Sequence, residues 1–452
     1  MSIFDGKRLS NDTFKLDAER MRAGWYSDKY FENIVGMLGD LAARGYGFGG
    51  ISRRLAAAGV DARGLDIGNL EVEMQWFTRR QPASLVAGVD KALAMLACCT
   101  GYFAPDGRFV NTYDQLEVEA VHDGMFVRYG GDPQRVQPVL KVRGRYRDFA
   151  LLETPTLGAL TRATRIATNV YNVLGAARGK PVLFFPARFD AHEVQAADGY
   201  AYNIAVQRFN ADNGHDVASY ISTDAQGDWW GGLGGGTIAH AAIAAFLGDT
   251  VECMLAFAET RPVEIPRIAL IDFDNDCVGT TLEVMDAMFA RYRELTDAGR
   301  HAEAQRYKLF GVRPDTSGTL RDISVPPLGQ KDLDMGVTPR LVFFLRQAAD
   351  EAWKRWQLPA EWAERAQQWC RDVKIVVTGG FSPRKIRRFE ELGVPADIYG
   401  VGSALFSNSD EEGTNNDFTA DIVRVKAHGS WHDLVKVGRR ACSNPDLEPL
   451  RS

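Results

Sequence analysis

The stretch from residue 374 to residue 405, KIVVTGGFSPRKIRRFEELGVPADIYGVGSAL, constrains the fold more than any other part of this chain. A β-branched run, Lys374 to Thr378, ends at two glycines, and a second apolar run, Asp397 to Val401, ends at Gly-Ser. Between these runs Ser382 stands where a helix N-cap belongs, and Pro383 suits the first helical position. Apolar residues recur at helical spacing at Ile386, Phe389 and Leu392. The pattern predicts a strand, a helix and a second strand.

Both glycine turns of such a unit are expected at one edge of the sheet, because a right-handed βαβ unit has parallel strands. Gly379 and Gly380 follow the first strand, and Gly402 and Ser403 follow the second. Free backbone N–H groups at the beginning of a helix favour an anion, and the last two strand loops of an α/β barrel frequently hold phosphate. A single pair of glycines often does no more than form a tight turn, but two glycine turns on adjacent strands favour a phosphate site.

The length and charge of the chain exclude several classes of protein. Its 452 residues are too many for one ordinary core, so two or three domains are expected. The formal net charge of −6 offers no basic footprint for nucleic acid or for an anionic membrane. The six cysteines include no C-x-x-C pair, which argues against a zinc site and a disulfide framework. Without an apolar leader or an apolar run of bilayer length, the protein is expected to be reduced and cytoplasmic.

Residues 1–150 are predicted to form a domain of mixed helices and strands, a sandwich of the α+β kind. A helical period covers residues 26–44, and strict alternation predicts a half-buried strand at residues 69–77. A further helix is predicted at residues 84–99, and further strands at residues 116–121 and 139–145. Residues 411–452, which alternate like strands from 418 to 437, are predicted to return to this domain.

Residues 151–410 are predicted to form an α/β barrel, because from Glu153 on strands and helices alternate. The candidate strands are Pro181 to Phe185, Val217 to Ser222, Arg267 to Phe273, Leu309 to Arg313, Val373 to Val377 and Asp397 to Val401. The candidate helices include Gly236 to Leu247, Thr281 to Thr296 and Pro339 to Trp353. Regular alternation predicts a parallel sheet, open or closed, and a length of about 260 residues is closer to a barrel.

Polar side chains follow several of these strands, at the end where barrels carry catalytic groups. They are Arg188, Ser222, Thr223, Asp224, Asp272, Asp274, Asp276, Arg313, Asp315 and Ser317. Each could be a solvated strand end, but together they form a ring of carboxylates, donors and arginines around one mouth. The run IDFDND lacks the glycine and distal glutamate of a calcium loop, so a carboxylate for substrate hydroxyls or for substrate-held magnesium is the better interpretation.

The glycine-rich segment Gly231 to His240, GGLGGGTIAH, matches neither a dinucleotide fingerprint nor a P-loop. A histidine just inside a predicted helix is often a packed polar residue. If this helix begins at the mouth of an active site, a role in which His240 faces phosphate is about as well favoured as a packing role.

Five segments in this order resemble the nicotinate phosphoribosyltransferase family. They are ETPTLGALTRATRIATN, PVLFFPARFD, GGGTIAHAAIAAFLGDT, GVRPDTSGTLRD and the block from TGGF to ALF. The resemblance extends from about Ser27 to Val437. It implies a type II phosphoribosyltransferase with an irregular TIM-like α/β barrel, an α/β sandwich domain, and active sites shared across a homodimer. It also implies nicotinate and phosphoribosyl pyrophosphate as substrates, magnesium carried with the diphosphate, and ATP as a further cofactor of some members.

The resemblance also assigns roles to individual residues. Tyr30, reaching in from a second subunit, would stack near the pyridine ring, with Thr223 in the loop that faces its substituent. Arg188 and Arg313 would contact carboxylate or phosphates, and Asp272 would hold ribose hydroxyls and the magnesium-bearing diphosphate together with Asp315. His240 matches a histidine that some members phosphorylate, and the glycine turns Gly379, Gly380, Gly402 and Ser403 would bind the 5′-phosphate.

Two departures leave alternatives open. Pro314-Asp315-Thr316-Ser317-Gly318 stands where many relatives read Asp-Ser-Gly, which leaves the role of Asp315 open. Asp224, in the loop expected near the pyridine substituent, could accept a hydrogen bond from an amide, which keeps nicotinamide as an alternative substrate. Quinolinate fits less well, because no basic cluster for two carboxylates stands out. A lyase or isomerase acting on a phosphorylated sugar and a non-catalytic nucleotide sensor are the alternatives from other classes.

Overall fold

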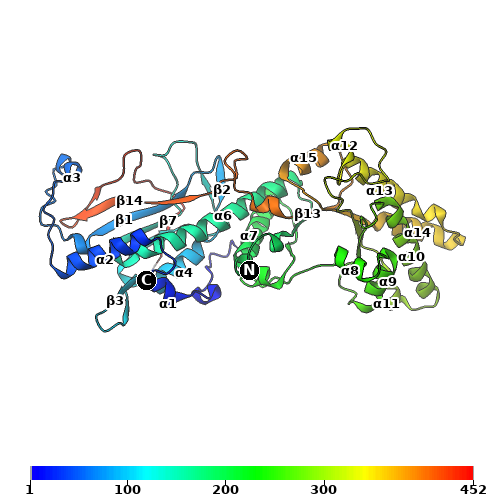
Figure 1. Ribbon diagram of the computed structural model, residues 1–452, viewed down its shortest axis with the longest axis horizontal. Helices are drawn as coiled ribbons and strands as arrows, with labels where there is room; N and C mark the ends of the chain where they lie inside the picture. The colour runs from blue at the N-terminus through cyan, green and yellow to red at the C-terminus, as the bar shows by residue number, and fades with distance from the viewer. Residues whose placement is uncertain (1–2, 451–452) are drawn as a thin grey trace. The chain divides into compact units, whose positions relative to one another are not determined.

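The computed structural model describes residues 3–450, which form two compact units (Figure 1). The first comprises the residues up to Tyr171, the segment Tyr200–Arg208 and the residues from Ser407 on. The second comprises Asn172–Gly199 and Phe209–Phe406. The predicted domain boundaries near residues 150 and 410 stay predictions, since a compact unit is not by itself an independently folding domain.

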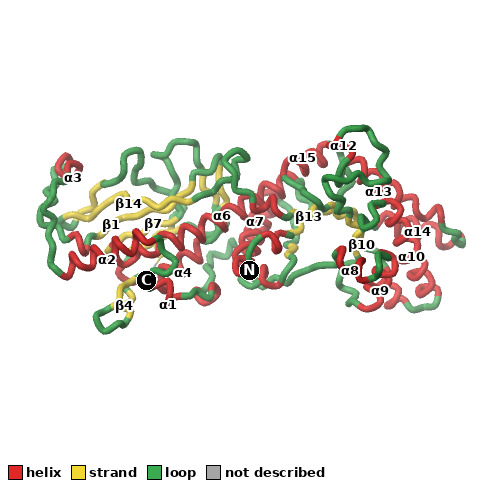
Figure 2. The backbone as a smooth tube through the Cα atoms, in the orientation of Figure 1, coloured by secondary structure: helices red, strands yellow, loops and turns green. Residues whose placement is uncertain are grey.

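The first unit is built on an antiparallel sheet with strand order β15-β14-β1-β7-β5-β16. Its strands are β1 (Glu71–Thr78), β5 (Glu117–Ala120), β7 (Leu140–Arg145), β14 (Phe418–Ala427), β15 (Ser430–Asp433) and β16 (Glu448–Leu450). Two small antiparallel pairs join β2 (Ala83–Leu85) to β6 (Phe126–Arg128) and β3 (Gly101–Phe103) to β4 (Phe109–Asn111). In the centre Val72 pairs with Val425 of β14 and with Gly144 of β7, so segments far apart in sequence share one sheet (Figure 2).

The helices of this unit include α1 (Ala18–Arg22), α2 (Lys29–Ala43), α3 (Arg53–Ala57), α4 (Val89–Cys99) and α5 (Tyr146–Phe149); α6 (Glu153–Ala176) and α7 (Gln195–Asn213) contribute residues to both units. Val72, Met74 and Trp76 of β1 pack into one core cluster with apolar residues of α4 and α6. The Trp76 indole N–H also donates to Thr156 Oγ1 at 3.1 Å. The helix predicted at residues 84–99 begins only at Val89, because the first of these residues belong to β2. Gly88, in a left-handed conformation at φ 94°, separates that strand from the helix.

Strand β1 is confirmed, but the prediction that it is half-buried is wrong. Glu73 and Gln75, on the face opposite the core cluster, are as fully buried as their apolar neighbours. The C-terminal segment covers Gln75, whose side chain bonds the carbonyl of Arg440 and the N–H of Cys442. Alternation predicts which residues share a face, but it does not reveal that a distant segment closes over the polar face.

The second unit is built on a parallel sheet with strand order β10-β11-β12-β13-β8-β9. Its strands are β8 (Val182–Phe184), β9 (Tyr220–Ile221), β10 (Ile268–Leu270), β11 (Gly311–Arg313), β12 (Lys374–Val377) and β13 (Ile398–Val401). All six predicted strands are therefore present, each shorter than predicted. The order is the one a barrel would have, with β13 paired to β8, but within residues 3–450 no hydrogen-bonded ladder joins β9 to β10. The sheet is a curled, open half-barrel, and complete closure stays a prediction.

Helices connect and cover these strands. They include α8 (His240–Ala245), α9 (Thr250–Thr260), α10 (Cys277–Asp297), α11 (His301–Ala304), α12 (Lys331–Asp334), α13 (Pro339–Glu351), α14 (Ala360–Asp372) and α15 (Pro383–Glu391). Helix α13 packs against α10, α14 and strand β12. Within the described part of the chain, no helix is long and apolar enough to span a bilayer.

Two predicted helix starts are corrected. Helix α8 begins at His240, not at Gly236, since each glycine before it would lose more backbone freedom than any other residue. Helix α10 begins at Cys277, before the predicted Thr281, because the Asp276 carboxylate accepts the Gly279 N–H at 2.9 Å and caps the first turn.

Candidate active site

The βαβ unit predicted from the sequence is present, and its two glycine turns lie at one edge of the parallel sheet. Strands β12 and β13 are parallel neighbours with Val377 opposite Tyr399, so the chain leaves both strands on the same side. Gly379 and Gly380 adopt φ values of 89° and 68°, a conformation that side-chain-bearing residues rarely tolerate. Both glycines are therefore required by the backbone, whatever their role toward phosphate.

The helix that follows the first turn begins as predicted. The Ser382 hydroxyl accepts the Lys385 N–H at 3.3 Å, and Pro383 occupies the first helical turn of α15. Its apolar residues Ile386 and Phe389 are buried, whereas Leu392 is 43% exposed. The first amides of α15 thus open directly beside the Gly379–Gly380 turn.

Lys385 is a cation at this turn that the sequence interpretation missed. Its ammonium donates to the Gly379 carbonyl at 3.2 Å and lies 4.2 Å from the centre of the Phe381 ring. Burial lowers the pKa of Lys385 to about 8. Its sequence context, PRKI within a helix start, resembles any solvent-facing helical lysine, so only the fold reveals this placement.

A group of charged side chains occupies the ends of strands β10 and β11. Asp272, which follows β10, is 8% exposed at its side chain, and its Oδ1 lies 3.1 Å from His240 Nε2. Arg313, the last residue of β11, donates to the carbonyl of Ile238 at 2.8 Å, in the segment that leads to His240. Four residues predicted separately, Asp272, Arg313, Asp315 and His240, are thereby brought to one place.

The pKa values of Asp272 and Arg313 reflect this proximity. Burial raises the pKa of Asp272 above its ordinary value; His240 acts to lower it, and the Asp315 carboxylate acts to raise it. Burial lowers the pKa of Arg313, and the carboxylates of Asp315 and Asp272 oppose that change. Two carboxylates thus share one arginine, an arrangement that leaves negative charge for a further cation to neutralise.

Asp315 also links this charged group to the glycine turn. A Cβ atom added to Gly379 would lie 3.4 Å from Asp315 Oδ1. The Thr378 N–H and hydroxyl both bond the carbonyl of Pro314, at 3.2 and 3.1 Å. The carboxylate group and the turn predicted for phosphate are therefore neighbours on adjacent strands.

Arg188 lies near the second glycine turn. It is exposed, and its guanidinium lies 5.4 Å from the centre of the Phe189 ring. The same ring would meet a Cβ atom added to Gly402 at 2.6 Å. Ser403 begins the short 3-10 helix η10 (Ser403–Phe406), so its amide opens beside this turn.

The loop after β9 is organised by Gln226, a second residue that the sequence interpretation missed. Its Oε1 accepts the N–H groups of Ser222 and Thr223, while Thr223 caps the 3-10 helix η7 (Asp224–Gly227). This is a capping box, and the spacing Thr-x-x-Gln was a readable signal for it. The Thr223 hydroxyl donates to Gln195 Oε1, and the Asp224 carboxylate accepts the Gly234 N–H at 2.8 Å. Both predicted residues thus have structural partners that hold the loop.

Tyr30 belongs to the first unit, whereas the other predicted site residues belong to the second. It is 57% exposed and lies at the beginning of α2. A hydrogen bond to Asp28, followed by partial burial, raises its pKa. Its contact with a pyridine ring stays a prediction.

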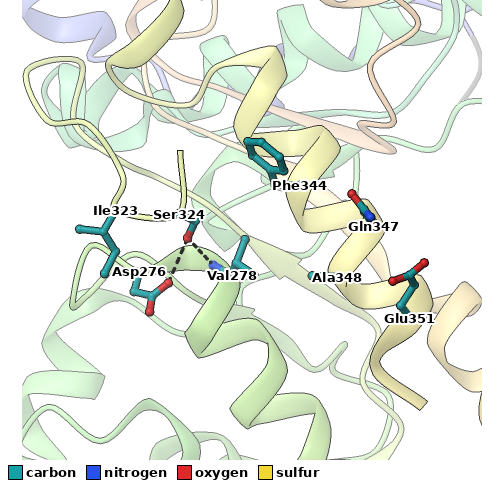
Figure 3. A pocket seen from close by; sticks show the side chains of 8 residues that line it. All are labelled: Asp276, Val278, Ile323, Ser324, Phe344, Gln347, Ala348 and Glu351. Atoms are coloured by element: carbon teal, nitrogen blue, oxygen red, sulfur yellow. Dashed lines mark hydrogen bonds between the residues drawn. The ribbon is translucent and has the colours of Figure 1, made fainter. Parts of the chain in front are cut away.

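A cavity of about 490 Å³ opens beside the loops that carry the carboxylates (Figure 3). It is lined by Asp276, Val278, Ile323, Ser324, Phe344, Gln347, Ala348 and Glu351. Asp276, a member of the predicted ring, lines it, but none of the residues to which the family resemblance assigns a role does. Within residues 3–450, no group of three or more His, Cys, Asp or Glu side chains is arranged to hold a metal ion. The pair Asp272 and Asp315 instead suits magnesium that arrives with a diphosphate, since magnesium is commonly held by one or two carboxylates plus substrate phosphates.

Comparison with known proteins shows where this fold occurs. No protein-family model matches the chain. Among solved structures, nicotinate-nucleotide pyrophosphorylase from Pyrococcus furiosus is similar with a TM-score of 0.61 and 22% identity, over 94% of this chain and 80% of that one. Human nicotinic acid phosphoribosyltransferase is similar with a TM-score of 0.50 and 16% identity, over 88% of this chain and 75% of that one. At these identities the likeness shows the fold, and it confirms at that level the resemblance seen in the sequence.

Proposed function

We propose that this chain, which has a nicotinate phosphoribosyltransferase-like fold, is an enzyme that joins nicotinate to phosphoribosyl pyrophosphate, forming nicotinate mononucleotide and pyrophosphate for NAD synthesis. One observation carries the proposal. Asp272, Arg313 and Asp315 lie together at the ends of adjacent parallel strands, next to the Gly379 turn. Diphosphate, ribose and phosphate each have a complementary group at this edge.

The reaction needs charge neutralisation more than proton transfer. The bond from ribosyl C1 to the pyrophosphate oxygen breaks, pyrophosphate leaves with the electron pair, and the pyridine nitrogen donates its lone pair to C1. The transition state resembles an oxocarbenium ion, as in glycoside cleavage. Because the pyridine lone pair is free, no general base is required. Preorganised donors that meet the developing charge usually contribute most to such catalysis.

The residues of the second unit can supply these functions. Arg313, which donates to the Ile238 carbonyl, would meet the pyrophosphate oxygens. Asp272 and Asp315 would hold the ribose hydroxyls and the magnesium that accompanies the diphosphate, which supplies further neutralisation when bound. The amides after Gly379, Gly380 and Gly402 would hold the 5′-phosphate.

Three further features belong to the same proposal. Stacking of Tyr30 of the partner subunit on the pyridine ring would require a homodimer, for which the exposure of this tyrosine leaves room. Complete closure of the half-barrel would bring the β9 loop with Thr223 opposite Asp272. With His240 Nε2 paired to Asp272, imidazole Nδ1 would attack the γ-phosphorus of ATP and take its phosphoryl group, and ADP would leave.

A substrate panel tests the proposal. The purified protein is incubated with phosphoribosyl pyrophosphate and magnesium, and with nicotinate, nicotinamide or quinolinate, each with and without ATP. We expect pyrophosphate and nicotinate mononucleotide from nicotinate alone. Turnover of nicotinamide but not nicotinate would move the assignment to the amide branch, where Asp224 would face the amide. No turnover with any pyridine would contradict the proposal.

A second candidate has one observation in its favour. A lyase or isomerase acting on a phosphorylated sugar needs a group that moves a proton, and the His240–Asp272 pair has the geometry for one. Such an enzyme would exchange a substrate C–H proton with solvent deuterium in the absence of any pyridine. Deuterium incorporation into a sugar phosphate would favour this reading over phosphoribosyl transfer.

A further inference from the structure

Two loops that carry the site carboxylates are joined by a set of hydrogen bonds behind them. The β10–α10 loop, residues 271–276, holds Asp272, and the β11 loop, residues 314–325, holds Asp315. Asp322 of the second loop is wholly buried. Its Oδ2 accepts the Cys277 N–H at 3.0 Å, and its Oδ1 accepts the Ser324 N–H at 2.9 Å.

Ser324 adds two more bonds between the loops, both drawn in Figure 3. Its hydroxyl donates to Asp276 Oδ1 at 3.0 Å and accepts the Val278 N–H at 3.2 Å. One small side chain thus bonds both the cap residue of α10 and its first turn. Ser324, Asp276 and Val278 also line the cavity, so the side chain of Ser324 borders open space.

Asn275 extends this connection toward the site through one side-chain and one backbone hydrogen bond. Asn275 donates from Nδ2 to the Arg321 carbonyl at 2.9 Å, and its own carbonyl accepts the Ile323 N–H at 3.0 Å. Asn275 adopts φ 57°, a left-handed conformation that asparagine tolerates better than most residues. Cys277 Sγ lies 3.6 Å from Thr316 Oγ1, one residue beyond Asp315. The connection therefore reaches from α10 to the residue next to the second carboxylate.

The physical need for such a connection follows from the carboxylates themselves. Asp272 and Asp315 repel each other when both are ionised, and each sits on a loop that could move away. Five hydrogen bonds join the second loop to the first loop and the start of α10, so the loops cannot separate without losing several partners, each costly to leave unpaired. The spacing of the two carboxylates is thus set before any ligand binds.

We propose that Asp322, acting with Ser324, is a positioning residue that sets the spacing of Asp272 and Asp315 for magnesium-bound phosphoribosyl pyrophosphate. This inference rests on the proposed function and extends it to residues that do not touch substrate. Outer partners of this kind typically change metal affinity or activity by about 10–100-fold when removed. We therefore expect their loss to weaken binding of the magnesium diphosphate with little change in the KM for nicotinate.

The test compares Ser324→Ala with Ser324→Thr. Ser324→Ala removes the hydroxyl and its bonds to Asp276 and Val278, whereas Ser324→Thr keeps the hydroxyl and adds a methyl group to a side chain that borders the cavity. Titration calorimetry with phosphoribosyl pyrophosphate and magnesium should show about tenfold weaker binding by Ser324→Ala and restored binding by Ser324→Thr. Asp322→Asn should weaken binding further, and Ser324→Ala keeps the inference testable if that variant does not fold.

A matched control lies at the far end of α10. Asp297→Asn perturbs a hydrogen bond from the Trp362 indole at 3.0 Å, remote in sequence from the site loops. It should leave the diphosphate affinity unchanged. Hydrogen exchange should quicken in residues 271–279 and 314–325 for Ser324→Ala but not for Asp297→Asn.

The outcomes distinguish a failure of the proposed function from a failure of the positioning role alone. Wild-type protein that neither binds the magnesium diphosphate nor turns over nicotinate would end the proposed function and this inference with it. Wild-type binding with an unchanged affinity in Ser324→Ala, or an equal loss in Asp297→Asn, would overturn the positioning role alone.

Discussion

Two buried carboxylate sites, Glu73 in the first unit and the pair Asp272 and Asp315 in the second, compensate their charge in opposite ways. In the first, Glu73 is fully buried, and three cations surround it: Arg143 at 2.6 Å, Arg424 at 3.3 Å and Lys141 at 3.6 Å. Burial acts to raise the pKa of Glu73, but the hydrogen bond from Arg143 and the three positive charges hold it below its ordinary value. In the second unit, Asp272 and Asp315 share one arginine, and the pKa of Asp272 is raised.

This difference distinguishes a carboxylate whose charge the protein itself compensates from a pair of carboxylates that act on one arginine. The Glu73 carboxylate is fully compensated by the protein, so a ligand would gain nothing there. The Asp272 and Asp315 carboxylates could bind the magnesium of a magnesium diphosphate, and the amides of the glycine turns could donate hydrogen bonds to a phosphate. Perturbed groups of this second kind are the ones that gather at functional sites.

The largest expected effect is the loss of stability when the Glu73 carboxylate is removed. Glu73→Gln leaves Arg143, Lys141 and Arg424 crowded without their shared carboxylate, and loss of one partner of a buried ion pair costs about 3–5 kcal/mol. Chemical denaturation should show this loss of stability. The KM values of the protein that remains folded should equal those of the wild type. A raised KM for phosphoribosyl pyrophosphate would contradict a purely structural role for Glu73.

The next effect tests the uncompensated site. Asp272→Asn keeps the size of the side chain but removes its charge, and turnover should fall by roughly 10²–10³-fold, the loss typical of one preorganised group. Stability should stay near that of the wild type, because burial already disfavours the ionised form of Asp272. Glu283→Gln, on an exposed position of α10, is the control. Turnover equal in both variants would remove Asp272 from the mechanism.

Lys385 should make the stability of the protein depend on pH. Its pKa of about 8 lies below its ordinary 10.5, so the folded protein loses this proton more readily than the unfolded chain. Stability should therefore rise with pH between 8 and 10.5, and below pH 8 the full penalty, roughly 3 kcal/mol, is present. Lys385→Met should be more stable than the wild type at pH 7, by less than this because the Gly379 bond is lost.

Thermal or denaturant unfolding of both proteins from pH 7 to pH 10.5 checks this expectation. The advantage of Lys385→Met should shrink steadily as pH rises through that range. A constant difference at all pH values would show that the lysine titrates normally.

The smallest effect concerns His240. Its ring is 46% exposed, so His240→Ala should fold normally. Loss of the partner of Asp272 should reduce turnover without ATP by about tenfold, as is typical for outer partners of a metal ligand, the role proposed for Asp272. Any stimulation by ATP should disappear, and stimulation that persists in the variant would assign the histidine a packing role only.

The sequence predicts the architecture of the second unit better than that of the first. Its six parallel strands were readable because each is a short apolar run followed by glycine or polar residues, and Ser382-Pro383 mark the start of α15. In the first unit, burial of Glu73 and Gln75 depends on residues near 440 that fold back over β1. No local pattern carries that information.

The candidate site shows the same limit. Strand ends pointed to Asp272, Arg313 and Asp315 before the structure placed them together. Lys385 and Asp322 were missed, because nothing in PRKI or TLRD distinguishes a buried, bonded side chain from a solvated one. Their partners come from other loops, and only the fold brings these loops into contact.

The most direct measurement is a calorimetric titration of magnesium-bound phosphoribosyl pyrophosphate into wild-type protein, Arg313→Gln and Glu73→Gln. Both site carboxylates act on Arg313, since Asp315 and Asp272 each oppose the lowering of its pKa by burial. The account predicts binding by the wild type, a loss on the order of 100-fold in Arg313→Gln, and wild-type affinity in folded Glu73→Gln. Equal affinity in the wild type and Arg313→Gln, or an equal loss in Glu73→Gln, would contradict it.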